Sequence, residues 1–123
     1  MKVTPVKTIL IVDDSPTERL ALSELLVQNG YRVITAENGS DGVEKARAQL
    51  PNLIIMDVVM PGVNGYQATR TLTRDETTRH IPIFICTSKG QETDRIWGLR
   101  QGAVDYLVKP VDTDELLSKI AAL

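Results

Sequence analysis

The feature that most constrains the fold is a short apolar run that leads into a single acid. Residues 53–56 are all apolar, Asp57 follows them, and Pro61-Gly62 ends the stretch a few residues later. An apolar run of this length, with Pro51 before it and a Pro-Gly break after it, is typical of a β-strand buried on both faces. Such strands belong to parallel sheets that helices cover on both sides. The sequence therefore predicts an α/β fold with Asp57 at the carboxyl end of a central strand.

Length and composition favour one domain that needs neither a structural metal nor a disulfide. A chain of 123 residues can bury its own core, so we expect a single domain over residues 1–123. Its one cysteine and one histidine exclude an internal disulfide and a Cys/His zinc site. A net charge of −2 disfavours nucleic-acid binding. No apolar segment reaches the length of a membrane span, and the start lacks a signal-peptide core. We expect a cytoplasmic protein that binds neither nucleic acid nor membranes.

Strand and helix signals alternate along the whole chain. Apolar segments bounded by turn residues predict strands at 8–12, 31–35, 53–57, 82–87 and 104–108. Periodic segments with terminal caps predict helices at 16–28, 41–49, 65–74, 92–100 and from 112 to the end. The first helix opens with an apparent capping box, in which Ser15 is the N-cap, Pro16 the first helical residue, and Glu18 reaches back to the cap.

The alternation predicts a doubly wound, five-stranded parallel sheet of the flavodoxin-like kind, with five helices. Connections of this length between buried strands imply right-handed crossovers. Of the common strand orders, 2-1-3-4-5 places the switch point between the first and third strands. Those strands end in Asp13-Asp14 and in Asp57, so we expect the three acids to converge. Thr87 after the fourth strand and Lys109 after the fifth reach the same edge.

These five residues suit metal-assisted phosphoryl transfer. Two like charges about 4 Å apart repel by ~1 kcal/mol in water and by ~4 kcal/mol at an effective dielectric of 20, so clustered carboxylates favour a divalent cation. An all-oxygen site suits Mg²⁺, which shares its ligands readily with phosphate. Asp57, which ends the central strand alone, is the best candidate nucleophile for an aspartyl-phosphate. Lys109 offers a positive charge and Thr87 a hydroxyl to a phosphoryl group.

The chain resembles the receiver domains of two-component response regulators over nearly its full length. The resemblance implies that Asp57 accepts a phosphoryl group from a histidine kinase with Mg²⁺ as cofactor. It implies metal ligation by Asp13, by Asp14 directly or through water, and by the main-chain carbonyl of Val59. It also implies a cis peptide bond before Pro110, where sequence statistics alone favour trans. The matching segments are Asp13-Asp14, Asp57 with Met60-Pro61-Gly62, Thr87, and Lys109-Pro110.

The same resemblance implies a switch and an output surface. Thr87 would move toward the phosphoryl group, and Tyr106 would rotate into the space it leaves. The output surface would then comprise residues 92–100, 104–108 and the last helix. Val59 and Lys89 occupy positions that tune the phosphoryl lifetime. Because valine cannot orient an attacking water, we expect slow to intermediate self-dephosphorylation.

A closer similarity is to the stand-alone receivers of chemotaxis-like systems that control twitching motility by type IV pili. It implies a chemotaxis-type histidine kinase and a downstream motility protein as partners, and no output domain after residue 123. We expect a monomer, with dimerisation on phosphorylation as an open alternative. The segments that carry this similarity are 13–18, 65–70, 91–94, 97–98 and 101–103.

Several alternatives stay open at this stage. The protein could regulate a partner directly, or it could serve as a phosphate sink for a shared kinase. A third alternative is a phosphatase with an aspartate nucleophile, but such enzymes place a second acid two residues after the nucleophile, where this chain has Val59. We therefore expect no enzyme activity beyond its own phosphorylation and dephosphorylation. Tyr106 could be ordinary packing, Cys86 a core residue, and His80 a surface residue without a phosphorelay role.

Overall fold

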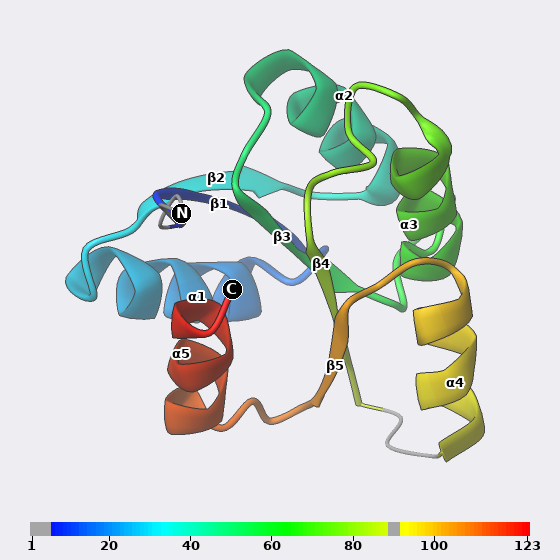
Figure 1. Ribbon diagram of the computed structural model, residues 1–123. Coiled ribbons are helices and arrows are strands. Elements are labelled where there is room, and N and C mark those ends of the chain that lie inside the picture. The colour runs from blue at the N-terminus through cyan, green and yellow to red at the C-terminus, as the bar shows by residue number, and fades with distance from the viewer. Residues whose placement is uncertain (1–5, 89–91) are drawn as a thin grey trace.

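The computed structural model describes residues 6–88 and 92–123, which form five strands and five helices in alternation (Figure 1). The strands are β1 Thr8–Val12, β2 Arg32–Ala36, β3 Leu53–Asp57, β4 Ile83–Thr87 and β5 Asp105–Val108. The helices are α1 Pro16–Gln28, α2 Gly39–Gln49, α3 Gly65–Arg74, α4 Glu92–Arg100 and α5 Thr113–Ala121. None of the helices in the described ranges has the length and apolar character that crossing a bilayer requires.

The strands form one parallel sheet in the order β2-β1-β3-β4-β5, which confirms the predicted fold class and strand order. The register pairs Val12 of β1 with Met56 of β3, and Asp57 of β3 with Cys86 of β4. The carboxyl ends of β1, β3 and β4 are therefore level with one another. This places whatever follows these strands at one edge of the sheet.

Helices cover both faces of the sheet, with α1 and α5 on one side and α2, α3 and α4 on the other (Figure 1). Successive strand residues point to opposite faces, and β1 shows this directly. Ile9 and Ile11 pack in the cluster that contains Leu26 of α1, whereas Leu10 and Val12 pack in the cluster on the other face. Each such buried aliphatic side chain contributes about 1.5–3 kcal/mol, which holds the strand ends in place.

The start of α1 differs from the predicted capping box in one respect. The Ser15 side chain accepts from the Glu18 N–H at 3.3 Å, as predicted, but the Ser15 N–H donates to the Asp13 carboxylate at 2.9 Å. Asp13 lies two residues earlier and reaches this N–H by a local turn. The Glu18 carboxylate is therefore not used in the cap. The reciprocal box occurs instead at α3, between Asn64 and Gln67.

Candidate functional site

Three carboxylates meet at the carboxyl edge of the sheet. Asp13 and Asp14 follow β1, and Asp57 ends the neighbouring strand β3. Among the described residues, these three offer carboxylate oxygens that all lie within 4.8 Å of one another. Asp13 and Asp57 are buried, whereas Asp14 is exposed. The acids that the sequence placed at strand ends thus lie together.

Lys109 follows β5 and reaches into the same group of acids. Its Nζ atom lies 3.0 Å from Oδ1 of Asp57, 3.1 Å from Oδ2 of Asp13 and 2.8 Å from Oε2 of Glu18. Its main-chain N–H donates to the carbonyl of Thr87 at 2.7 Å, which fixes the end of β5 to the end of β4. The Lys109–Pro110 peptide bond is cis, the arrangement that the resemblance implies.

The electrostatics of the site follow from one lysine shared among several acids. Burial raises the pKa of the Asp57 carboxyl; the hydrogen bond from Lys109 acts in the opposite direction, and the charge of Asp13 adds to the rise. Burial by itself would lower the pKa of Lys109, but the hydrogen bonds to Glu18, Asp57 and Asp13 together raise it. The lysine therefore stays charged. Asp57 shares that one positive charge with Asp13 and Glu18, so the lysine does not fully offset the burial of its carboxylate.

An open cleft adjoins these groups. Its volume is about 480 Å³, and its lining residues are Asp14, Glu18, Asp57, Val59, Thr87, Ser88, Lys109 and Pro110. Thr87 is buried at the end of β4, and Val59 is 60% exposed. Lys89, which the resemblance assigns to lifetime tuning, lies outside the described residues. A small anion entering this cleft would meet Asp57, Thr87 and Lys109 together.

Tyr106 lies half-buried on β5, close to a glycine of α4. A Cβ atom built on Gly98 would lie 3.4 Å from the Tyr66 ring, 3.5 Å from Ile85 and 3.7 Å from the Tyr106 ring. Both tyrosines pack against the core cluster on the α2–α3 face of the sheet. The absence of a side chain on Gly98 therefore leaves room between α3, α4 and β5 at the place where Tyr106 sits.

Two residues of the site were not identified from the sequence. Glu18 was interpreted only as a helix cap, yet it contacts Lys109. Arg19, next to it, donates from Nη1 to the main-chain carbonyl of Asp13 at 2.7 Å. A signal was available, because the first turn of a helix that follows a strand lies at the same sheet edge as the end of that strand.

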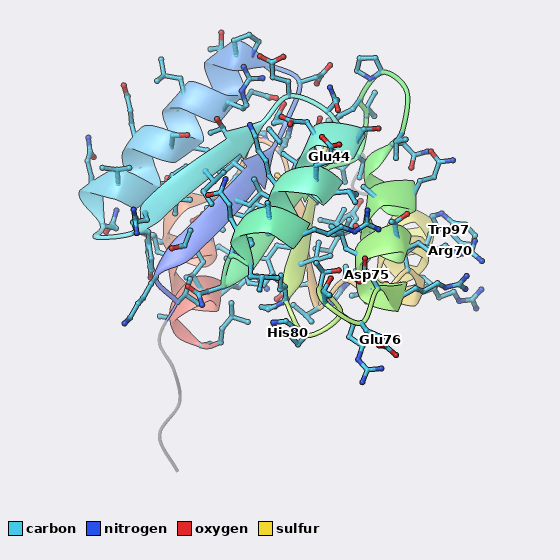
Figure 2. The ribbon with its side chains drawn as sticks, turned by 90° about the horizontal axis from the view of Figure 1, so that it is seen from above. Glu44, Arg70, Asp75, Glu76, His80 and Trp97 are labelled. Atoms are coloured by element: carbon cyan, nitrogen blue, oxygen red, sulfur yellow. The ribbon has the colours of Figure 1, made fainter. Side chains whose placement is uncertain are left out.

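Two further reactive residue types lie at different distances from this chemistry. His80 is exposed in the connection between α3 and β4 (Figure 2). That connection leads into the amino end of β4, opposite to the edge that carries the acids. Cys86 is the neighbour of Asp57 across the β3–β4 register, but it is buried, and burial raises the pKa of its thiol to about 12. His80 therefore lies at the wrong edge of the sheet to act at Asp57, and the Cys86 thiol beside Asp57 is held neutral.

The donor set suits a hard divalent cation. Carboxylates that crowd within 4.8 Å repel one another, and Lys109 supplies only one positive charge against them. The donors are all oxygen atoms, and the adjoining cleft leaves space for water or phosphate ligands. This is the coordination that Mg²⁺ favours over softer metals.

Comparison with known proteins gives consistent results. The family model of the response regulator receiver domain matches residues 9–121. Protein PilH of Pseudomonas aeruginosa is 57% identical over 115 residues, which cover 94% of this chain and 95% of that protein. Several other curated relatives are longer, and the chain spans about a quarter to about half of their length.

Solved structures agree with the sequence relatives. The chemotaxis protein CheY4 of Vibrio cholerae superimposes with a TM-score of 0.87 at 30% identity, over 94% of this chain and 96% of that one. The receiver domain of the sensor histidine kinase PA1611 from Pseudomonas aeruginosa, with a magnesium ion coordinated in its active site cleft, gives a TM-score of 0.86 at 34% identity, over 94% of each chain. This chain belongs to the response regulator receiver domain family.

Proposed function

We propose that the protein is a phosphorylation switch in which Asp57 accepts a phosphoryl group from a histidine kinase. The observation that carries the proposal is the setting of Asp57. Its carboxylate is buried, borders the open cleft, lies 3.0 Å from Lys109, and sits beside the carboxylates of Asp13 and Asp14. A carboxylate in such a setting can attack phosphorus and form an acyl phosphate.

In the proposed step, an oxygen of the Asp57 carboxylate attacks the phosphorus atom of a phosphohistidine. The bond from phosphorus to the imidazole nitrogen breaks, and its electron pair leaves with the imidazole. Lys109 supplies positive charge to a phosphoryl oxygen, and the Thr87 hydroxyl supplies a hydrogen-bond donor. The contribution of these residues is positioning and electrostatic stabilisation, as is general in phosphoryl transfer. The chain thereby acts on itself rather than as an enzyme on other molecules.

We infer that Mg²⁺ is the cofactor of this step. Asp13, Asp57 and the main-chain carbonyl of Val59 would hold the ion, together with Asp14 directly or through water. When bound, the ion supplies positive charge that offsets the clustered carboxylates and the incoming phosphoryl oxygens. Support comes from the all-oxygen donor set and from the relative whose active site cleft contains magnesium.

The switch that we propose runs from Thr87 to Tyr106. Thr87 moves toward the phosphoryl group, and Tyr106 rotates inward into the space that Thr87 leaves. The position of Gly98 on α4 supports this role. Gly98 lies beside the Tyr106 ring and has no side chain that would contact it. The added charge of about −1.5 to −2 is large enough to bias such a two-state element.

The output surface is the face formed by α4, β5 and α5. It exposes apolar side chains that a partner could cover, and Trp97 of α4 lies at the margin of the molecule in Figure 2. The exposed apolar residues on α4, β5 and the turn between them are Ile96, Trp97, Leu99, Val104 and Val108. Clustered apolar exposure of this kind is a general mark of interaction sites.

The lifetime of the phosphoryl group is expected to be slow to intermediate. Val59 is exposed at the cleft, and its side chain cannot orient an attacking water. Lys89 would shield or contact the phosphoryl group. Decay within a few seconds would contradict this expectation.

For the cellular role, we propose control of twitching motility by type IV pili, or of chemotaxis, in the cytoplasm. A chemotaxis-type histidine kinase would be the donor and a motility protein the receiver of the signal. Support is the similarity to stand-alone receivers noted from the sequence and the 57% identity to PilH over nearly all of both chains. The protein would act as a single receiver domain and a monomer, or dimerise on phosphorylation. Service as a phosphate sink for a shared kinase is the alternative.

The test uses Mg²⁺ and acetyl phosphate with intact-mass spectrometry on the wild type and on Asp57→Asn. The proposal predicts one added phosphoryl group in the wild type, none in the variant, and none in the wild type when EDTA replaces Mg²⁺. Failure of the wild type to gain mass and to bind beryllofluoride would overturn it. A pull-down with the phosphorylated protein then separates the direct regulator, which captures a motility protein, from the phosphate sink, which captures a kinase alone.

A further inference from the structure

Glu18 is a fourth carboxylate at the site, and it makes the shortest contact to Lys109. Its Oε2 atom lies 2.8 Å from Nζ, compared with 3.0 Å for Asp57 and 3.1 Å for Asp13. Glu18 also lines the open cleft. Its side chain is 50% exposed, whereas that of Lys109 is 17% exposed. A half-exposed acid therefore holds a largely buried lysine from the solvent side.

Neither the metal site nor the helix cap explains this placement. The clustered carboxylates that suit Mg²⁺ are those of Asp13, Asp14 and Asp57. The Ser15 N–H, which Glu18 would bond in a capping box, already donates to Asp13. A half-exposed ion pair adds little to stability. The remaining effect of Glu18 is on what Lys109 can bind.

Lys109 has no donor to spare in this state. An ammonium group carries three N–H bonds, and Nζ has three carboxylate partners at hydrogen-bond distance. A phosphoryl oxygen can therefore bind Lys109 only where one of those partners leaves. In the metal-free protein, release of Asp13 or Asp57 would leave a buried carboxylate without its cation, which is costly. Glu18 can turn into water instead, so it is the partner that exchanges most readily.

We propose that Glu18 is a positioning residue that holds Lys109 in the unphosphorylated protein and is displaced from it by the phosphoryl group. The proposal rests on the phosphoryl-acceptor function of Asp57 given above. Glu18 thus competes with the phosphoryl group for the lysine. The competition slows phosphorylation. It also shortens the life of the product, because in the phosphorylated protein Glu18 can draw Lys109 away from the phosphoryl group that the lysine stabilises.

The test compares Glu18→Gln with Glu24→Gln, which removes the same charge from an exposed position on α1. Phosphorylation by acetyl phosphate with saturating Mg²⁺ should be about fivefold faster in Glu18→Gln, and decay of the adduct about fivefold slower, the scale of one partly screened charge. The salt dependence of the phosphorylation rate should become shallower. Glu24→Gln should match the wild type in phosphorylation rate, in decay rate and in salt dependence. Equal rates in the wild type and Glu18→Gln would overturn the proposal.

A second comparison asks whether Glu18 acts through the lysine. In a Lys109→Ala background, the effect of Glu18→Gln should vanish, because the group for which the two anions compete is gone. An undiminished effect would mean direct repulsion of the donor and would overturn the proposal.

Side-chain NMR of Lys109 gives a readout that does not depend on the rate. Glu18→Gln should shift the lysine ε-methylene resonances in the free protein and leave them unchanged in the beryllofluoride complex. Equal shifts in both states would contradict displacement. A wild type that neither gains a phosphoryl group nor binds beryllofluoride would instead refute the proposed function itself.

Discussion

A Cβ atom placed on Gly65 would overlap the main-chain carbonyl oxygen of Asp57. It would also lie 2.8 Å from the carbonyl carbon of Asp57 and 2.9 Å from the Cα atom of Val58. All of these are backbone atoms, so no side-chain rotation can make room. The Gly65 N–H donates to the Val58 carbonyl at 2.9 Å. The first residue of α3 is thus held directly against the backbone of Asp57, the proposed phosphoacceptor.

The first prediction is that Gly65→Ala lowers the free energy of unfolding by about 2–3 kcal/mol, because the added methyl forces the backbone apart. The same displacement should slow phosphorylation of Asp57 by acetyl phosphate. Urea unfolding and intact-mass kinetics measure the two effects. Gly62→Ala is the matched control: Gly62 has φ +76° but nothing within 4 Å of its added Cβ, so it should cost only about 1 kcal/mol. Equal losses in the two variants would contradict the overlap.

The second prediction concerns the charge of Asp57. Burial raises its pKa in the folded state, so its contribution to stability is fully present below the unfolded pKa and is lost as pH rises through the folded pKa. At neutral pH the ionised carboxylate therefore opposes folding. Without Mg²⁺, Asp57→Asn should be more stable than the wild type by roughly 1 kcal/mol.

Urea unfolding in EDTA and in MgCl₂ measures this difference. The wild type should gain more stability from Mg²⁺ than Asp57→Asn does, because the variant lacks one of the proposed ligands. A variant that is less stable than the wild type in EDTA would show that the hydrogen bond from Lys109 outweighs burial.

The third prediction concerns Asp75 at the end of α3. Hydrogen bonds from the Thr77 main chain and hydroxyl, then one from Arg47, lower the pKa of Asp75 to about 2. Its stabilising contribution is therefore present above the unfolded pKa and is lost as pH falls through the folded pKa. NMR titration should report a pKa near this value, and Thr77→Ala should raise it. Arg47→Gln should raise it less, and an Asp75 pKa that neither variant changes would refute the assignment.

The fourth prediction concerns the thiol of Cys86. Burial raises its pKa to about 12 and covers the sulfur, so the folded protein should resist alkylation. At pH 8, modification by iodoacetamide should be at least ~100-fold slower in buffer than in urea, since it requires opening of the structure. Mass spectrometry measures both rates. Comparable rates in the two solvents would mean that β4 is open to solvent.

The sheet and the meeting of its acids could be predicted because both follow from regular backbone geometry. Buried parallel strands read as apolar runs, and the residues that end them share an edge. Asp13, Asp57 and Thr87 therefore came together without knowledge of any loop conformation. The element bounds shifted by at most two residues, as at β2, which was predicted at 31–35 and spans Arg32–Ala36.

Side-chain competition was harder to predict. From the sequence, the Ser15 N–H could bond either to Glu18, as in a capping box, or to Asp13. In the structure it donates to Asp13. Burial along α1 is a second example, because its apolar residues Leu20 and Val27 are 60% and 58% exposed. Both lie off the face that carries Leu26. The roles of Tyr106 and Val59 stay predictions, because they depend on movement and on chemistry rather than on position.

The bond from Lys109 to Asp13 joins residues 96 positions apart in the chain. A nascent chain therefore carries Asp13 long before it carries Lys109, and the two can meet only after β4 and β5 have been synthesised and paired. Contacts of such long sequence separation form late and slowly. Incomplete or truncated chains would therefore lack the phosphoryl-accepting chemistry proposed here. A kinase would then not phosphorylate a chain that is unable to fold.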